Sequence, residues 1–340
     1  MSPEPRLLRR PGPMLASVLP SWRGHGPQAA GVSLTSMTLT YLEVNGWMLT
    51  TAGVTILIDP ILEGSLDFGM PDVYTATKRV LPSYGLLETM PPLDALVITQ
   101  GLDDHAHKST LEKLSRMDPL LPVIAPPSAY PVLEGLFEDV TYITSRSRRL
   151  ELPYLGLDAL PTVRLPQSQD LDQMIIRPRA AAGTALEHGL AVRATSGALV
   201  GPPWQRRENG YLLSPAKTEH GETPRGPSLY LEPHVEYDAA ELASLAPVDA
   251  IVTPTSGQGL PGFELVHGPE ASVGLVQLLG ARWVLPMDNG AVDTAGLSAS
   301  LIRRIGSEDE FANRLRAEGI GAEVLDVRPG QPLILKLDRQ

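Results

Sequence analysis

Short runs of hydrophobic residues recur along most of the chain, and polar or turn-forming residues separate them. Three runs, at 36–44, 46–52 and 54–60, are rich in β-branched and aromatic residues, which favour strands. Asn45-Gly46 and Ala52-Gly53 stand between these runs, and such pairs favour tight hairpin turns. The pattern therefore predicts an antiparallel meander at the start of the folded chain.

Strand-like runs then alternate with helical periodicity. The segment 109–117 carries Leu111 and Leu114 on one helical face, and Ser109 and Glu112 have the spacing of a capping box at its start. Further strands are expected at 94–100, 121–126, 140–144, 190–196, 209–214, 228–234, 249–254, 282–288, 322–327 and 332–337. Further helices are expected at 128–137, 238–245, 268–280 and 308–319.

The order of these elements predicts the architecture. Each half begins with antiparallel strands and ends with alternating strands and helices, as two copies of one mixed layer would. We therefore expect an α/β fold, a four-layer αββα sandwich in which two mixed β-sheets lie face to face with helices outside.

The first residues differ from the rest of the chain. Residues 1–36 are rich in Pro, Gly and Arg and have no sustained hydrophobic period, which predicts a disordered tail before one domain at 37–340. The alternatives to a disordered tail are a basic targeting arm, or an upstream start codon with the folded part beginning near Met37.

Composition narrows the function classes. The net charge of −11 argues against nucleic acid as the main partner, and no apolar run approaches the length of a membrane-spanning helix. We expect a cytoplasmic protein that acts on a small-molecule or lipid-like substrate. The absence of cysteine excludes disulfides, thiolate metal ligands and a cysteine nucleophile, so any metal must bind to histidine or to oxygen ligands.

The segment 97–107, VITQGLDDHAH, contains several side chains that could bind a metal or take part in catalysis. A strand-like run opens into a loop that holds two aspartates and two histidines within five residues. Such a loop is either a metal site or a solvated turn before a helix. Later potential ligands also follow apolar strands, where an α/β scaffold can direct loop side chains into one crevice.

These residues carry a family resemblance. The segment 40–60 resembles the opening strands of the metallo-β-lactamase superfamily, which end in an Asp-Pro pair, and 97–107 stands where that family has its H-x-H-x-D-H motif. The segments 228–234 and 268–288 are similar to the strand that ends in the bridging aspartate and to the closing helix and strand. The most similar branch contains ascorbate-phosphate lactonase and the phospholipase D that acts on N-acyl ethanolamine phospholipids.

The chain departs from the family at the first metal. Gln100 and Leu102 occupy the two leading histidine positions, and residues 194–204 lack the middle histidine. The resemblance therefore implies that the first metal is lost. Gln100 either hydrogen-bonds a water there or is an ordinary polar loop residue.

The second metal position keeps its ligand types. Asp104 and His105 stand at the Asp-His positions of the motif, His234 at the bridging aspartate and Asp288 at the last histidine. The resemblance thus implies one divalent metal on two histidines and two aspartates, with zinc favoured and iron or manganese as alternatives.

Other residues receive supporting roles. Asp104, with Asp103 beside it, is the expected proton acceptor, and Asp59 resembles the family's carboxylate that orients the metal loop without binding metal. His107 is expected to support the site or to lie at the surface, with a role as fifth ligand as the alternative. The segment 201–211, with Trp204, Arg206, Arg207 and Glu208, is either a lid or substrate-recognition loop or a plain surface hairpin.

Two functions remain open at this point, and a third, iron-based redox chemistry, fits the mixed histidine and aspartate ligands but has no separate support. The first is a metal-dependent hydrolase that activates water to cleave an ester, lactone, amide or phosphodiester, the substrate classes that the resemblance implies. The second is a non-catalytic scaffold of the same fold that binds a ligand or a protein partner in the same cleft.

Overall fold

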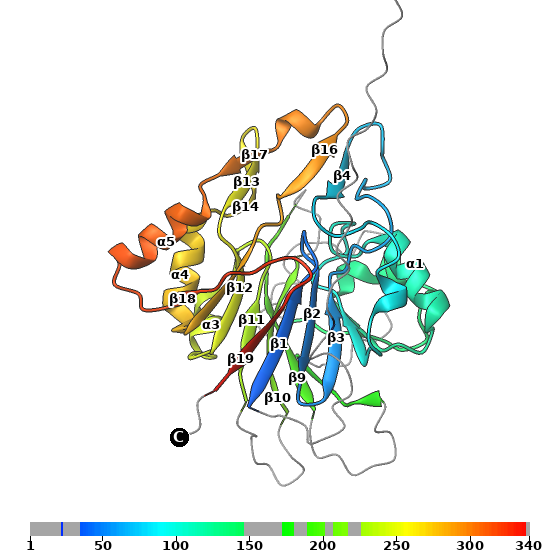
Figure 1. Ribbon diagram of the computed structural model, residues 1–340, viewed down its shortest axis with the longest axis horizontal. Coiled ribbons are helices and arrows are strands. Elements are labelled where there is room, and N and C mark those ends of the chain that lie inside the picture. Colours follow the sequence, from blue (N-terminus) through cyan, green and yellow to red (C-terminus); the bar gives the residue numbers. More distant parts are fainter. Residues whose placement is uncertain are drawn as a thin grey trace, which may run out of the picture.

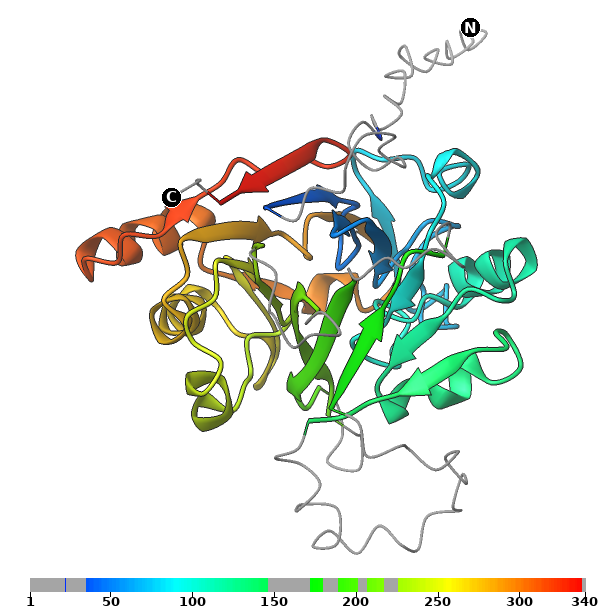
Figure 2. The same ribbon diagram turned by 90° about the horizontal axis from the view of Figure 1, so that it is seen from below.

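The computed structural model describes Trp22 and residues 35–145, 172–179, 189–200, 207–216 and 226–337. Two seven-stranded sheets lie face to face and helices cover their outer sides (Figures 1 and 2), as the order of the elements predicts. In the described part of the chain, no helix has both the length and the apolar character needed to cross a bilayer.

The first sheet begins with the predicted meander. Its strands, in spatial order, are β19 (Pro332–Lys336), β1 (Ser36–Tyr41), β2 (Trp47–Thr51), β3 (Val54–Ile58), β5 (Ala95–Val97), β6 (Val123–Ala125) and β7 (Val140–Tyr142). Ala52 and Gly53 both have positive φ, 51° and 77°, which makes the tight turn between β2 and β3. From β3 to β7 the strands are parallel, so their carboxyl ends lie along one edge.

The second sheet has the same mixed character. Its strands, in spatial order, are β18 (Glu323–Val324), β15 (Trp283–Met287), β12 (Ala250–Pro254), β11 (Leu229–Leu231), β10 (Asn209–Pro215), β9 (Leu190–Ser196) and β8 (Gln173–Ile176). β10 runs antiparallel to both β9 and β11, so it begins beside the ends of its two neighbours.

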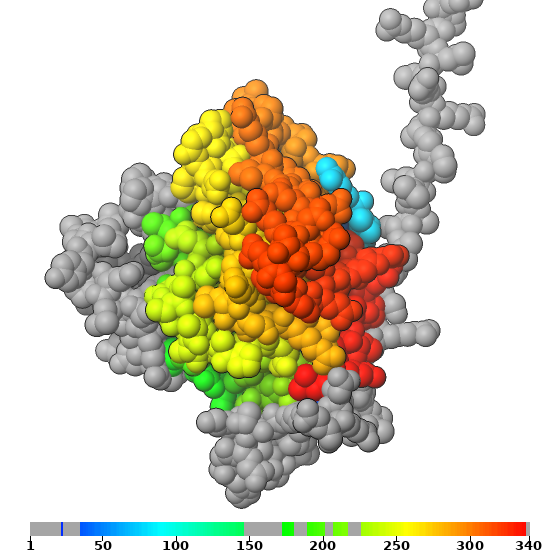
Figure 3. Space-filling view, turned by 90° about the vertical axis from the view of Figure 1, so that its left-hand side faces the viewer, coloured from blue at the N-terminus to red at the C-terminus, as the bar shows by residue number. Residues whose placement is uncertain are grey.

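Alternating side chains of the strands build two kinds of core. Ile56 and Ile58 of β3 point into the core between the sheets, whereas Leu57 points to the helices on the outer side. The outer helices of the first sheet are α1 (Lys108–Met117) and α2 (Tyr130–Leu133). Those of the second sheet are α3 (Ala239–Ala243), α4 (Pro269–Leu279) and α5 (Glu308–Ala317), and Figure 3 shows their side of the molecule.

Some elements were not predicted. β4 (Thr75–Lys78) pairs with β16 (Val292–Ala295), and β13 (Gly257–Leu260), β14 (Phe263–Val266) and β17 (Arg303–Ile305) form a small three-stranded sheet. Short 3-10 helices occur at Leu87–Thr89, Pro127–Ala129 and Ala299–Leu301. Because these elements are short and exposed on one side, their sequences carry little periodicity.

Two local predictions are wrong. The capping box of Ser109 and Glu112 does not form, because α1 already begins at Lys108 and its N-cap residue, His107, makes no side-chain cap. Instead, Asp103 accepts the backbone N–H of Lys108 at 3.1 Å. The helix predicted at 128–137 is shorter, because it ends before Gly135, whose φ of 76° is left-handed.

Trp22 lies within the segment that was predicted to be disordered. Its indole N–H donates to the Thr89 hydroxyl at 3.2 Å, and its ring packs against the core between the first sheet and its helices. The rest of 1–34 lies outside the described residues, so the boundary near residue 36 stays a prediction.

The Tyr211 hydroxyl joins the two sheets. Tyr211 belongs to β10 of the second sheet, and its hydroxyl donates to the carbonyl of Ile98 beyond β5 of the first sheet at 2.8 Å. The substitution Tyr211→Phe removes this buried bond and leaves the carbonyl without its donor. We expect a loss of about 1–2 kcal/mol in the free energy of unfolding, measured by urea denaturation.

Tyr130→Phe is the matched control. The hydroxyl of Tyr130 donates to Glu134 near the surface. Its removal should leave the free energy of unfolding equal to that of the parent. Equal effects of the two substitutions would contradict the cross-sheet role of Tyr211.

Candidate metal centre

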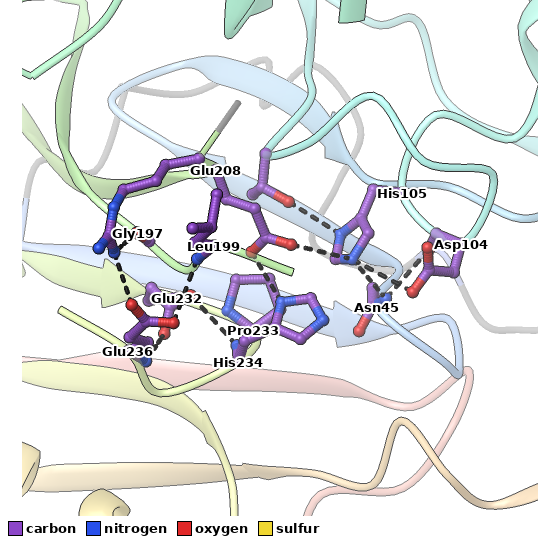
Figure 4. A network of polar contacts seen from close by, with 12 residues as sticks. Asn45, Asp104, His105, Gly197, Leu199, Glu208, Glu232, Pro233, His234 and Glu236 are labelled. Carbon is purple, nitrogen blue, oxygen red and sulfur yellow. Dashed lines mark hydrogen bonds and ion pairs between the residues drawn. The ribbon is translucent and has the colours of Figure 1, made fainter. Parts of the chain in front are cut away.

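The candidate site lies where strands of both sheets end. Asp59 follows β3 and Thr99 follows β5 in the first sheet, whereas Glu208 precedes β10 and Glu232 follows β11 in the second. The backbone N–H of Asn209 donates to the carbonyl of Thr99 at 2.9 Å, so the two sheets are joined here. Figure 4 shows the side chains that converge between them.

Asp59 orients the first histidine. Its Oδ1 accepts the backbone N–H of Thr99 at 2.8 Å, and its Oδ2 accepts the Thr99 hydroxyl and lies 2.8 Å from His105 Nδ1. All three residues are fully buried. Because His105 Nδ1–H faces this carboxylate, Nε2 is the nitrogen that carries the lone pair when His105 is neutral. Asp59 therefore has the supporting position that the family resemblance implies.

Asp104 and Asn45 lie beside that free nitrogen. Asp104 Oδ2 is 3.3 Å from His105 Nε2, and Asn45 Nδ2 is 3.2 Å from the same atom. Asn45 Nδ2 also donates to the backbone carbonyl of Asp104 at 3.0 Å. Asp104 Oδ1 is buried and has no hydrogen-bond partner among the described residues.

Glu208 lies between the two histidines. Its Oε2 is 2.7 Å from His234 Nδ1 and its Oε1 is 3.9 Å from His105 Nε2. The two imidazole rings have their centroids 5.1 Å apart. Figure 4 shows the other ring nitrogen of His234 turned toward Asp104 and Asn45. One carboxylate thus connects ligands that come from different sheets.

Glu232 shapes the loop that carries His234. Its Oε1 accepts the backbone N–H of His234 at 3.2 Å, and its Oε2 accepts that of Glu236 at 3.0 Å. Val235 between them has a positive φ of 58°. Glu236 in turn accepts the backbone N–H of Leu199 at 3.1 Å, which fixes the loop to the end of β9.

Two sets of side chains could bind a metal ion. Asp104, His105 and His234 form one set, and Glu208, Glu232 and His234 form the other. Within each set, the candidate ligand atoms lie within 4.8 Å of one another. Both sets share His234, so they form one continuous centre.

The charges of this centre displace its pKa values. Burial favours neutral His105, but Asp104 and Asp59 outweigh it and raise the pKa of His105 well above its usual range. Burial likewise opposes the charge on His234, but Glu208 raises its pKa. Burial and the neighbouring Glu208 raise the pKa of Glu232 to about 7. Without a cation, bound protons therefore balance the buried carboxylates.

Asp288 lies outside both sets. Three of the four predicted ligands, Asp104, His105 and His234, come together, but Asp288 is in neither set of close ligand atoms. Its Oδ2 pairs with Arg304 Nη1 at 3.0 Å, and its side chain is 36% exposed. Its neighbour Asn289 does reach the loop of His234, through a 3.3 Å bond from Nδ2 to the carbonyl of Pro233.

Of the remaining residues of the motif, Asp103 and His107 have structural partners, whereas the amide of Gln100 has none among the described residues. Both oxygens of Asp103 accept backbone N–H groups, from Lys108 and from Phe68, each at 3.1 Å, so this carboxylate anchors the loop and starts α1. His107 is buried, with Nδ1 2.8 Å from the Thr110 hydroxyl. Gln100 is fully buried, and its amide has no partner in the described part of the chain.

Glu208 and Glu232 were missed in the sequence. Glu208 was considered only within the segment 201–211, whose Trp204 and Arg206 lie outside the described residues. Yet Gly197 donates to the Glu208 carbonyl at 3.1 Å, which puts Glu208 opposite the end of β9, where the middle histidine was expected. The sequence predicted strands at 190–196 and 209–214 but not their antiparallel pairing, which returns the chain to the same edge.

A model of a known protein family matches most of the chain. Residues 38–288 match the family described as the beta-lactamase superfamily domain. The chain belongs to the beta-lactamase superfamily. The resemblance to the metallo-β-lactamase fold is confirmed, whereas the resemblance to the lactonase and phospholipase D branch stays a prediction. No curated protein matches the sequence significantly.

Solved structures show the same beta-lactamase superfamily fold. A metallo hydrolase from the archaeon Ignicoccus hospitalis is 15% identical, with 89% of this chain and 100% of that chain covered and a TM-score of 0.53. An isothiocyanate hydrolase from Delia radicum gut bacteria is 13% identical, with 88% and 100% covered and a TM-score of 0.54. CmlA, a diiron β-hydroxylase from Streptomyces venezuelae, is 15% identical, with 88% and 54% covered and a TM-score of 0.51.

The metal-free protein is expected to lose stability as the pH rises from about 6.5, the usual pKa of histidine, through about 7 and above. The pKa values of His105 and His234 are raised in the folded state, and Glu232 titrates at about 7, so unfolding releases protons in this window. Burial lowers the pKa of His107, but that group acts below this window. Each released proton contributes a slope of up to about 1.4 kcal/mol per pH unit.

The measurement is urea denaturation of chelator-treated protein across this pH range. Stability that rises with pH would show that the centre does not retain protons when it is free of metal.

Proposed function

We propose that this protein is a metal-dependent hydrolase with one divalent cation bound by Asp104, His105, His234 and Glu208. The observation that carries the proposal is the convergence of the Asp104, His105 and His234 ligand atoms within 4.8 Å at the joined ends of two sheets. Asp59 behind His105 supports it, because metal-binding histidines donate their other nitrogen to such a carboxylate.

Buried atoms without partners fit a cation at this position. Asp104 Oδ1 and Asn45 Oδ1 are buried and lack hydrogen-bond partners in the described part of the chain. An unpaired buried acceptor is costly, and several buried carboxylates near one another are costly unless positive charge balances them. A divalent cation would satisfy both requirements.

The geometry favours Glu208 over Asp288 as the fourth ligand. Glu208 is fully buried and lies beside both histidines, whereas Asp288 is part of an exposed pair with Arg304. The set keeps two histidines and two carboxylates, as predicted, but takes the second carboxylate from another strand. Such nitrogen and oxygen ligands suit zinc, with iron or manganese as alternatives.

The aspartate side chains around the site have different proposed roles. When bound, the cation supplies Lewis-acid polarisation of a carbonyl or phosphoryl oxygen and lowers the pKa of water. Asp59 fixes the ring of His105. In the metal-free protein, burial opposes the charge of Asp104, but the charges of His105 and His234 lower its pKa. The cation would take over this effect when the histidines bind it as neutral rings, so Asp104 is an ionised ligand and the proposed proton acceptor, while Asp103 fixes the loop behind it.

An apolar rim near the site favours a substrate with an apolar part. The rim consists of Phe68, Met70, Val73, Leu297 and Leu301, all with exposed side chains. The Phe68 backbone is bonded to Asp103, next to Asp104, and the Ser298 N–H donates to the Val73 carbonyl at 3.0 Å, which joins the two segments. We propose a small-molecule or lipid-like ester, lactone, amide or phosphodiester as the substrate class.

Metal analysis of four variants tests the ligand set. His105→Ala, His234→Ala and Glu208→Gln should each hold well under half of the parental metal, because each removes a ligand. Asp288→Asn is the matched control, since it also turns a carboxylate into a carboxamide, and it should keep the parental content. Loss in Asp288→Asn with retention in Glu208→Gln would restore the set predicted from the sequence.

Hydrolysis tests the function itself. The metal-loaded protein should cleave a member of a panel of ester, lactone and phosphodiester substrates, and His105→Ala should not. A well-folded parent protein that takes up no zinc, iron or manganese would instead favour a non-catalytic scaffold.

The support by Asp59 gives a separate prediction. Asp59→Asn keeps the four ligands but removes the charge behind His105, so metal affinity should fall about 10- to 100-fold. Asp94→Asn is the control, because this carboxylate also accepts a backbone N–H, from Thr55 at 2.7 Å. Chelator competition should show unchanged affinity for the Asp94 variant. Equal affinities in all three proteins would exclude the support by Asp59.

A further inference from the structure

The connection between β1 and β2 has an unusual backbone. Glu43 and Val44 both adopt left-handed conformations, with φ of 69° and 56°. β-Branched residues such as valine rarely adopt this conformation, and such backbones persist only where the surroundings impose them. Such strain is concentrated at functional sites, so the turn raises the question of what it positions.

The turn is held from several sides. The buried carboxylate of Glu43 accepts the backbone N–H groups of Arg79, Val80 and Leu81, at 2.9, 3.1 and 2.6 Å. The hydroxyl of Tyr41 donates to the carbonyl of Val44 at 3.0 Å. These bonds hold Glu43 and Val44 in their left-handed conformations. They therefore determine where the next residue along the chain points.

That residue is Asn45, and the turn places its amide at the metal centre. Asn45 is 2% exposed, and its Nδ2 lies 3.2 Å from His105 Nε2 and 3.0 Å from the carbonyl of Asp104. Figure 4 shows its amide between Asp104 and His105. Its Oδ1 is buried without a hydrogen-bond partner among the described residues.

The orientation of this amide conflicts with a cation on His105. His105 gives its Nδ1–H to Asp59, so Nε2 carries the lone pair that a cation would take. An N–H group only 3.2 Å from Nε2 would then point at positive charge. The two ends of an amide have nearly the same shape, so a rotation of 180° puts oxygen in place of nitrogen.

We propose that Asn45 is a further ligand of the cation and binds it through Oδ1. This inference rests on the proposed function, which puts the cation on Asp104, His105 and His234. A neutral amide oxygen adds a ligand without charge, and the charges of Asp104 and Glu208 already balance a divalent ion. The rotation gives the unpaired Oδ1 a partner and ends the contact between Nδ2 and His105. It also breaks the bond from Nδ2 to the carbonyl of Asp104, so the interaction of Oδ1 with the cation has to outweigh that loss.

The test uses Asn45→Leu, which keeps the size of the side chain and removes its oxygen. Zinc affinity, measured by chelator competition, should fall about tenfold or more, as for other changes around metal ligands. In the cobalt-substituted protein, the visible spectrum should change in intensity, because the coordination number falls by one. Asn45→Asp keeps an oxygen ligand and should retain metal.

Asn289→Leu is the matched control. Asn289 is also buried and contacts the loop of His234, but it faces the Pro233 carbonyl rather than His105. Its cobalt spectrum should equal that of the parent, because the number of ligands is unchanged even if the altered loop weakens zinc binding. Circular dichroism checks the folding of each variant, and Asn45→Ser replaces Asn45→Leu if the latter does not fold.

The outcomes separate the two proposals. A parent protein that binds neither zinc nor cobalt removes the proposed function and this inference with it. A parent that binds both, with an unchanged affinity and spectrum in Asn45→Leu, overturns the ligation alone. Weaker binding with an unchanged cobalt spectrum also overturns it, because Asn45 then acts only by positioning Asp104.

Discussion

The buried carboxylate of Asp59 determines the geometry of the centre. It receives the backbone and hydroxyl of Thr99 and faces the ring of His105, so it joins the ends of two parallel strands to the loop beyond them. A parallel pair ends at one edge of its sheet, and only there can a carboxylate after β3 reach a loop after β5. The direction of His105 Nε2 therefore depends on the register of the first sheet.

Charge is the second constraint on this region. Three fully buried carboxylates, of Asp59, Glu208 and Glu232, surround two histidines. These histidines, His105 and His234, are buried as well. Such a concentration is stable only with protons or with a cation between the groups. The backbone N–H groups that Glu232 accepts stabilise its own loop, whereas Glu208 bonds to a histidine. These different partners explain why we assign the ligand role to Glu208 and a shaping role to Glu232.

The sequence predicts the structural features that depend on local pattern. It does not predict the features that depend on how distant segments of the chain meet. The strand at 190–196, the turn at Ala52-Gly53 and the two facing sheets follow from periodicity and turn chemistry, and the structure confirms them. The approach of Asp104, His105 and His234 follows from the order of the strands. Glu208 was not found in this way, because its place depends on the antiparallel pairing of β9 with β10, which the strand pattern alone did not predict. The pairing of Asp288 with Arg304 was not found either, because Arg304 lies in β17, a short strand without hydrophobic periodicity.

The contribution of both sheets to the centre bears on the order of folding. His105 and Asp104 follow strands of the first sheet, while Glu208 and His234 adjoin strands of the second, more than a hundred residues further along the chain. A chain in which only one sheet has formed offers at most half of the proposed ligands. A cation at the proposed centre would therefore bind after the sheets dock, at a late stage of folding, and it would selectively stabilise chains in which that docking is complete.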